Sequence, residues 1–310
     1  MDPLDAPFES KTFMNFPLCT DLSQLDAQCV ILGIPFGNPY PHEEWENDQS
    51  HAPTAIRHAS ARLSMGLDRW DFDLGGLLLA DPNFRIVDCG DVPGDPSDPE
   101  AHYRSAERIV RAIIARHAIP IVLGGDHGVP IPVLRALETY SPVTLIQVDA
   151  HIDWRDEVGG VHEGYSSPIR RASELAHIDR IFQIGIRSQG SARSQEVADA
   201  LAYGAKIITA YEVHEHGIEA ILSQIPTGGC YYLTIDADGL DPSVMPAVAG
   251  PAAGGLLFHH VRSLIHGLAA KGKLLGMDIV EITPKRDINE ISAITAGQII
   301  LNFIRAVQSS

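Results

Sequence analysis

The sequence predicts an α/β fold, a three-layer α/β/α sandwich around a mostly parallel sheet of about eight strands. Eight short runs rich in Val, Ile and Leu recur, and such continuous apolar runs are typical of strands buried on both faces of a parallel sheet. Stretches of helix length separate them, and this alternation places helices on both faces of the sheet. The eight runs are CVILGIP (29–35), FRIVDCG (84–90), IPIVLGG (119–125), VTLIQV (143–148), RIFQIGI (180–186), AKIIT (205–209), YYLTID (231–236) and KLLGMDIV (273–280).

Two of the separating segments show clear helical periodicity. Segment 99–117 carries Ile109, Ile113 and Ile114 with charged residues between them, so these isoleucines are expected to face the sheet. The terminal segment 288–307, INEISAITAGQIILNFIRAV, is the second. No linker-like gap, internal repeat or low-complexity tract interrupts the pattern. We therefore expect one domain over residues 1–310, with residues 1–28 as an N-terminal extension.

The composition indicates a globular protein with a sizeable core. The chain has 310 residues, 45% of them apolar. No apolar run approaches the roughly 18 residues of a membrane span, and the first thirty residues are acidic where a signal peptide would be basic. The four cysteines show no C-x-x-C spacing, so free thiols are expected. We expect a cytoplasmic protein with no membrane partner.

The charge balance restricts the class of partner. Lys and Arg number 23 against 40 Asp and Glu, which gives a net charge of −17. Such a surface repels phosphate backbones, so nucleic acid is excluded as a partner. It would attract a cationic small-molecule substrate, although a need for solubility explains the same charge.

Polar residues follow three of the predicted strands at their carboxyl ends, where open α/β sheets bind their ligands. LGGDHG follows the third run, DAHID the fourth and TIDADGLDP the seventh. Side chains two positions apart on an extended chain share a face, so Asp149, His151 and Asp153 can converge. The same spacing aligns Asp236 with Asp238.

Together with His127, these residues form a set of two imidazoles and four carboxylates. So much negative charge packed away from water costs several kcal/mol for each unpaired ion, and divalent cations remove that cost. DADGLD partly resembles a calcium loop, but Gly239 stands one position early and no Glu occupies the twelfth place. A structural histidine or solvated acids would explain each motif alone. Because all three motifs end separate strands, we predict a metal site, with Asp126 orienting the ring of His127.

These motifs resemble those of a known family. GGDHG, DAHID and TIDADGLDP, followed by GPAAGGL (250–256) and DIVEITP (278–284), look like the ureohydrolases, the family of arginase and agmatinase. SHAPTAIRHAS resembles an early segment of that family, with Ala52 in place of its glycine. The resemblance runs from about Val30 to the C-terminus and implies an arginase-like fold.

The resemblance implies two manganese ions about a bridging hydroxide. Mostly oxygen ligands with a single imidazole for each ion suit Mn²⁺, whereas imidazole also suits Ni²⁺, so both metals remain candidates. By the resemblance, one ion would be bound by His127, Asp149, Asp153 and Asp236, and the other by His151, Asp149, Asp236 and Asp238.

The resemblance also implies a reaction. The enzyme would hydrolyse a linear guanidino or amidino C–N bond, as agmatinase does, and release urea or a substituted urea and an amine. Paired metals lower the pKa of the water between them, which supplies a nucleophile at neutral pH. Asp153 would take the proton of the nucleophile and pass it to the departing amine. Glu281 would bind the guanidinium of the substrate through charge-assisted hydrogen bonds.

Two departures from the agmatinase pattern leave the substrate open. Where many agmatinases have SHGTPFRRA, this chain has GYSSPIRRA (164–172), so Tyr165 occupies the place of a proton-shuttling histidine. His162 is a candidate substitute in catalysis, although a surface loop residue explains it equally well. Gly128 replaces a usual serine. Guanidinobutyrate, guanidine and alkylated biguanides are therefore alternatives to agmatine.

Two further expectations concern the loops near the crevice and the oligomeric state. Segment 36–53 contains Tyr40, Trp45, Glu43, Glu44, Glu46 and Asp48 and should approach the same crevice, as should segment 154–164. Either loop can be a pocket wall or a solvated surface. The family commonly forms trimers and hexamers, so we expect a homo-oligomer. The alternative is a weakly active partner subunit in a hetero-oligomer.

Overall fold

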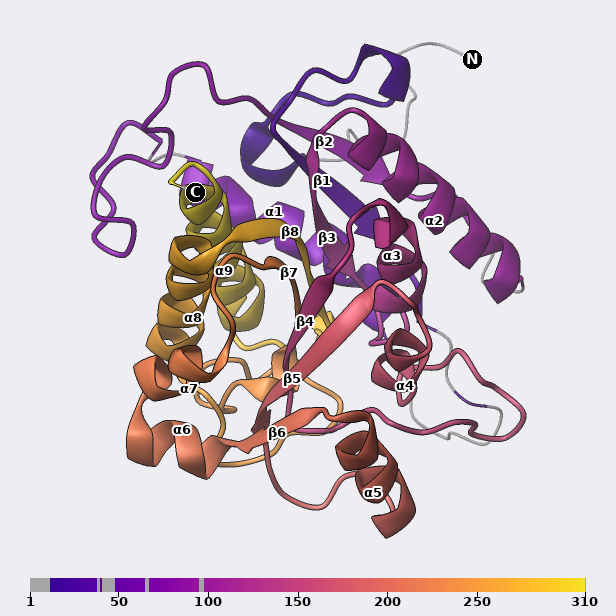
Figure 1. The fold of residues 1–310 in the computed structure, drawn as a ribbon. Helices are drawn as coiled ribbons and strands as arrows, with labels where there is room; N and C mark the ends of the chain where they lie inside the picture. Colours follow the sequence, from indigo (N-terminus) through magenta and orange to yellow (C-terminus); the bar gives the residue numbers. More distant parts are fainter. Residues whose placement is uncertain (1–11, 38–39, 41–47, 65–66, 95–97, 310) are drawn as a thin grey trace.

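The computed structural model contains an eight-stranded sheet and describes residues 12–37, 40, 48–64, 67–94 and 98–309. All neighbouring strands are parallel, in the order β2-β1-β3-β8-β7-β4-β5-β6 (Figure 1). This confirms the predicted fold class. The strands are β1 (Cys29–Ile34), β2 (Ile86–Asp91), β3 (Ile119–Gly124), β4 (Val143–Val148), β5 (Ile178–Ile186), β6 (Lys206–Thr209), β7 (Cys230–Asp236) and β8 (Lys273–Val280).

The sheet separates two hydrophobic cores. Along β1, Ile31 packs in one core, while Val30 and Leu32 pack in the other. Successive strand side chains point to opposite faces, so a strand between two cores must be apolar at nearly every position. This explains why the strands appear in the sequence as uninterrupted apolar runs.

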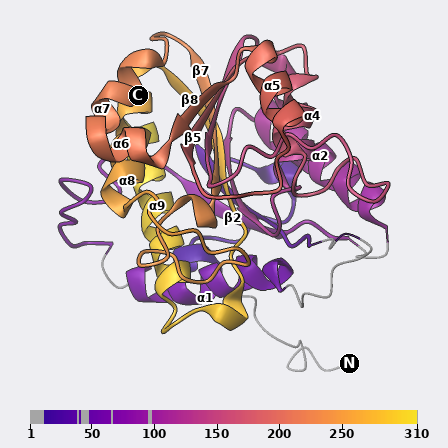
Figure 2. The same cartoon turned by 90° about the horizontal axis from the view of Figure 1, so that it is seen from below.

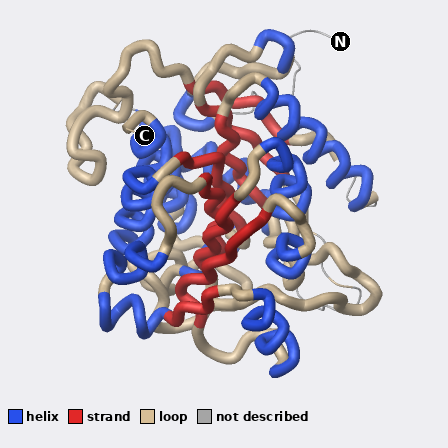
Figure 3. Tube along the Cα trace, in the orientation of Figure 1, coloured by secondary structure: helices blue, strands red, loops and turns tan. Residues whose placement is uncertain are grey.

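Helices cover both faces of the sheet (Figures 1 and 2). Their apolar sides supply the second half of each core. One layer consists of α1 (Ala52–Ser64), α6 (Ala210–His216), α7 (Ile218–Gln224), α8 (Phe258–Lys271) and α9 (Ile291–Val307). The other consists of α2 (Pro99–Ala115), α3 (Pro130–Ala136), α4 (Pro168–Ser173) and α5 (Ser194–Tyr203). The tube view of Figure 3 shows the strands enclosed between these helices.

Helix α2 shows how the sequence sets the bounds of an element. The side chain of Asp98 accepts a hydrogen bond from Ala101 N at 3.0 Å, and Pro99 begins the helix. Ile113 and Ile114 are buried in the core as predicted, and Ile109 packs against the same core while partly exposed. Val110 is fully buried as well, so the buried stripe is wider than the three isoleucines.

The four central strands place their carboxyl ends around one crevice. β3 and β4 follow one another in the sequence, but β8 and β7 lie between them in the sheet. This reversal of strand order is a topological switch point, where α/β sheets bind ligands. Gly239, at the end of the 3₁₀ turn Ala237–Gly239 after β7, allows the approach of the β4 end, since a Cβ there would lie 2.6 Å from Asp149 N.

Part of the expected N-terminal extension belongs to the core. Phe13 and Met14 are buried against α1. Phe13 N donates to Asp88 Oδ2 at 2.8 Å, and Met14 N donates to Ser60 Oγ at 2.8 Å. No helix within the described ranges is both long and apolar enough to cross a membrane.

Candidate metal centre

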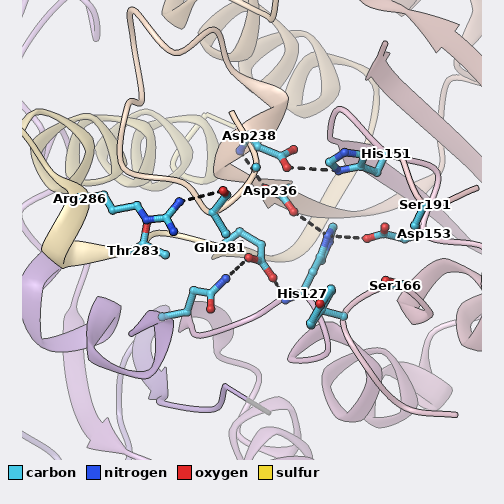
Figure 4. A pocket seen from close by; sticks show the side chains of 14 residues that line it. His127, His151, Asp153, Ser166, Ser191, Asp236, Asp238, Glu281, Thr283 and Arg286 are labelled. Atoms are coloured by element: carbon cyan, nitrogen blue, oxygen red, sulfur yellow. Dashed lines mark hydrogen bonds and ion pairs between the residues drawn. The ribbon is translucent and has the colours of Figure 1, made fainter. Parts of the chain in front are cut away.

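The structure brings the six predicted ligand residues together at the carboxyl ends of three strands. Figure 4 labels all of them except Asp149. His127 follows β3, the DAHID residues follow β4, and Asp236 ends β7. Five of them form two groups that share Asp149, and Asp153 lies beside His127 of the first group. Each group offers carboxylate oxygens and one imidazole nitrogen within the reach of a single ion.

The first group surrounds the ring of His127. Its Nδ1 lies 3.0 Å from Asp149 Oδ2, 2.9 Å from Asp153 Oδ2 and 3.1 Å from Asp236 Oδ2. Nδ1 is buried and has no hydrogen-bond partner within the described part of the chain. A nitrogen lone pair and three carboxylate oxygens pointing at one spot repel each other unless a cation or a proton lies between them. This arrangement fits a metal ion.

The second group surrounds the ring of His151. Its Nδ1 lies 3.5 Å from Asp149 Oδ1 and 3.2 Å from Asp238 Oδ2. Asp149 therefore directs one oxygen at each group, as a bridging ligand would. The backbone helps to orient this carboxylate, because His151 N donates to Asp149 Oδ1 at 2.6 Å. The imidazole in each group also differs from the all-oxygen ligand sets typical of calcium.

A chain of buried side chains fixes the ring of His127. Its Nε2 lies 3.1 Å from Thr234 Oγ1, and that hydroxyl donates to Asp278 Oδ1 at 2.6 Å. Tyr232 donates to Asp278 Oδ2 at 2.8 Å. With the Thr234 hydrogen committed to Asp278, Nε2 must donate and Nδ1 keeps its lone pair for a metal.

The sequence suggested Asp126 as the residue that orients His127, but the contact to Nε2 of this ring comes from Thr234. Asp126 Oδ1 accepts a hydrogen bond from Gly128 N at 2.9 Å, while Thr234 holds the imidazole. The glycine at position 128, in place of the usual serine, has a steric explanation. A Cβ there would lie 2.2 Å from the hydroxyl oxygen of Tyr103.

The ligand residues have strongly shifted pKa values. Burial favours the neutral ring of His127, but the surrounding carboxylates outweigh this effect and raise its pKa well above the ordinary value. Burial also raises the pKa of Asp153 to about 6, and the Asp149 carboxylate adds to the rise. Without cations the folded site therefore retains protons, which bound metal ions would displace.

Glu281 lies at the same crevice in a strained backbone conformation. Its φ is +65°, a left-handed value that costs a non-glycine residue about 1–3 kcal/mol. The turn directs its carboxylate to His127 N, which donates to Oε1 at 2.8 Å, while Gln49 Nε2 donates to Oε2. Burial, with the nearby Asp126, raises the pKa of Glu281 to about 8. Asp153 is also left-handed, with φ of +45°.

A cavity of about 410 Å³ opens on both groups and on Glu281. Tyr165 lines it, with its ring centroid 4.5 Å from that of Tyr40. Four lining residues lie outside the motifs quoted from the sequence: Gln49, Ser191, Ala249 and Arg286. Ser166, Gly250 and Thr283 belong to the quoted segments 164–172, 250–256 and 278–284.

The structure does not bring His162 to this cavity. Its side chain is exposed, its Nδ1 lies 3.1 Å from Asp156 O, and it lines a separate surface depression with Tyr103 and Arg135. Of the acidic loop, Asp48 is buried and accepts a hydrogen bond from Lys285 N at 2.9 Å. Its other named residues, Glu43, Glu44, Trp45 and Glu46, lie outside the described residues.

Comparison with known proteins agrees with this geometry. The model of the arginase family matches residues 27–305. A guanidinopropionase from Pseudomonas aeruginosa is 31% identical, over 94% of this chain and 90% of its own length. An agmatinase from Photorhabdus laumondii is 30% identical, over 94% of this chain and 91% of its own.

Solved structures show the same relationship. The crystal structure of a hypothetical agmatinase from Burkholderia thailandensis superposes with a TM-score of 0.82 at 29% identity, covering 97% of this chain and 92% of that one. The family match spans most of the chain, including both ligand groups and Glu281. The chain therefore belongs to the arginase family and is a metal-dependent ureohydrolase.

Proposed function

We propose that the cavity binds two divalent ions, Mn²⁺ or Ni²⁺, and hydrolyses the guanidino C–N bond of a linear substrate to urea and an amine. The observation that carries this proposal is the split carboxylate of Asp149, with one oxygen beside His127 and the other beside His151. Two adjacent ions would lower the pKa of a water molecule and so supply a nucleophile at neutral pH.

Glu281 is positioned to bind the guanidinium of the substrate. Its oxygens accept hydrogen bonds from His127 N and Gln49 Nε2, so the carboxylate is fixed before the substrate arrives. Planar guanidinium groups form strong paired hydrogen bonds with carboxylates. Fixing the substrate in this way lowers the entropic cost of reaching the reactive geometry.

Asp153 is the proposed proton carrier. It belongs to the His127 group, lines the cavity and has a pKa raised by burial toward the neutral range. A carboxylate of this kind can accept a proton from the attacking water and deliver it to the leaving nitrogen. His162 has no part in the proposal, because its ring lies outside the cavity.

Relatives named agmatinase and guanidinopropionase make agmatine and 3-guanidinopropionate the first substrates to test. We expect urea release from at least one linear guanidino compound after loading with Mn²⁺ or Ni²⁺. Elemental analysis should give two ions per chain. Protein stripped of metal is the control, and the absence of urea across agmatine, the guanidino acids, guanidine and alkylated biguanides with both metals would refute the proposal.

A homo-oligomer and a cytoplasmic location remain predictions. Trp70 and Phe72 are 62% and 89% exposed, and apolar side chains so exposed are candidates for a subunit contact. Light scattering after size exclusion would give the oligomer number. A related chain that co-purifies with this one would favour a hetero-oligomer.

A further inference from the structure

Arg286 places a permanent positive charge in an otherwise acidic cavity. Fourteen described residues line this cavity, and Arg286 is the single Lys or Arg among them. It ends the short 3₁₀ helix Pro284–Arg286, five residues after Glu281. Segment 284–286 is attached to the rest of the cavity by the hydrogen bond from Lys285 N to the buried carboxylate of Asp48.

The guanidinium of Arg286 is held by neutral groups. Its Nη1 donates to Val248 O at 3.2 Å and to Ala249 O at 2.8 Å. Across the residues that the structure describes, Arg286 forms no ion pair with a carboxylate. Its charge is therefore not compensated by any carboxylate in these ranges, and one side of the group is fixed in position.

The surroundings of Arg286 leave room for a ligand group. Ala249 and Gly250 form the adjacent wall and carry little side chain. A Cβ built at Gly250 would meet no atom within 4 Å. In Figure 4, Arg286 and Asp153 lie on opposite sides of Glu281, so a substrate held by Glu281 can react on one side and extend toward Arg286 on the other.

We propose that Arg286 selects linear guanidino acids, in which a carboxylate stands at the end opposite the guanidinium, over guanidino amines. This inference rests on the proposed function of the same cavity. A carboxylate would gain a charge-assisted bond to a preset guanidinium that no described carboxylate pairs, whereas an ammonium group would meet a like charge. The overall charge of −17 attracts cations to the protein, so preference for an acid must come from a local group.

The test compares 3-guanidinopropionate, 4-guanidinobutyrate and agmatine on the metal-loaded full-length protein, with urea release as the readout. We expect the wild type to prefer the acids. Arg286→Ala should lower the ratio of kcat/KM for acid over amine by about 10- to 100-fold. The loss should lie mainly in KM, because the tail is bound equally in the ground and transition states. Arg286→Glu should shift the ratio further toward agmatine.

Two matched variants separate charge from structure. Arg286→Lys keeps the charge and should keep the preference for acids, while Lys285→Ala removes a neighbouring exposed cation outside the cavity and should leave the ratio as in the wild type. Melting curves and metal content show whether each variant is folded. If Arg286→Ala does not fold, the ratio measured for Arg286→Gln against Arg286→Lys decides.

The outcomes distinguish this inference from the proposed function. Efficient hydrolysis with the same ratio of acid to amine in the wild type, Arg286→Ala and Arg286→Glu would overturn the role of Arg286 and leave the proposed function standing. A wild-type preference for agmatine would overturn it as well. No urea from any substrate with either metal would overturn the proposed function, and the inference with it.

Discussion

The ligand groups and the loop that carries Arg286 line one cavity but are held in different ways. His127, Asp149 and Asp236 are buried at strand ends, where backbone and side-chain hydrogen bonds fix them. Arg286 is exposed and is bound by two loop carbonyls. Reactive groups on rigid strands and selective groups on exposed loops allow one fold to keep its chemistry while its substrate changes.

Asp149→Asn should give the largest effect, because among the described residues this side chain alone offers an oxygen to both ligand groups. An amide cannot supply the two negative oxygens, so both ions should be lost and activity should fall at least about 1,000-fold. Urea release and metal content measure the change. Asp179→Asn, an exposed carboxylate on β5, is the control and should change activity less than about twofold. Near-normal activity of Asp149→Asn would mean that the shared cluster is not the reactive centre.

These ligands were predictable because local geometry determines them. Side chains at every second position share a face, and parallel strands end at the same edge of the sheet. The spacing of Asp149 and Asp153 therefore predicted that they lie close together, without any knowledge of distant contacts. Glu281 was expected from the family resemblance, and the strand order β3-β8-β7-β4 places the strand end before it next to the others.

Other parts of the site depend on contacts between distant elements. Gln49 and Glu281 are 232 residues apart in sequence. Their hydrogen bond forms only when the folded chain brings the segment before α1 to the end of β8. Thr234 and Asp278 appear in the sequence as ordinary members of apolar strands, and their pairing needs the register of β7 with β8. His162 illustrates the opposite error, because closeness in sequence to Tyr165 did not place it in the cavity.

Metal removal should have the second largest effect. It would test the rigid region, that is the ligand residues at the strand ends, as a whole. Each ion that binds only the folded state at 100 times its Kd stabilises it by about 2.7 kcal/mol, so two ions contribute about 5.4 kcal/mol. At about 2 °C for each kcal/mol, chelation should lower the melting temperature by about 11 °C. Calorimetry with and without chelator measures this shift. Readdition of Mn²⁺ should restore it, and identical melting curves would show that the carboxylates need no cation.

The drop in melting temperature on chelation should become larger as the pH rises. Burial, aided by nearby carboxylates, raises the folded-state pKa to about 6 for Asp153 and about 8 for Glu281, against an unfolded value near 4. Stability from protonated carboxyls is complete below the unfolded pKa and is lost as pH rises through the folded values. Metal-free protein should therefore lose stability between about pH 4 and 8, while deprotonation strengthens metal binding. A melting difference that shrinks over this interval would contradict this linkage.

Thr234→Val tests how much of the rigid region depends on the orientation of one ring. The change removes the hydroxyl between His127 and Asp278 but keeps the shape of the side chain. Loss of such an orienting group typically lowers metal affinity 10- to 100-fold. Titration of metal-free protein with Mn²⁺ measures it. Thr144→Val, on the neighbouring strand β4, is the matched control and should not alter affinity.

His162→Ala should have the smallest effect. It would show whether the loop around His162 belongs to the part of the site that selects the substrate. The ring is exposed, bonded to the carbonyl of Asp156 and outside the cavity, so its removal should change kcat/KM less than about twofold. Tyr165→Phe is the informative comparison, because Tyr165 lines the cavity and contributes the one hydroxyl that could replace a shuttling imidazole at its position. A drop of more than tenfold in His162→Ala, with an unchanged Tyr165→Phe, would mean that the loop around His162 closes onto the cavity during turnover. The part of the site that selects the substrate would then have to include the loop around His162 as well as the loop that carries Arg286.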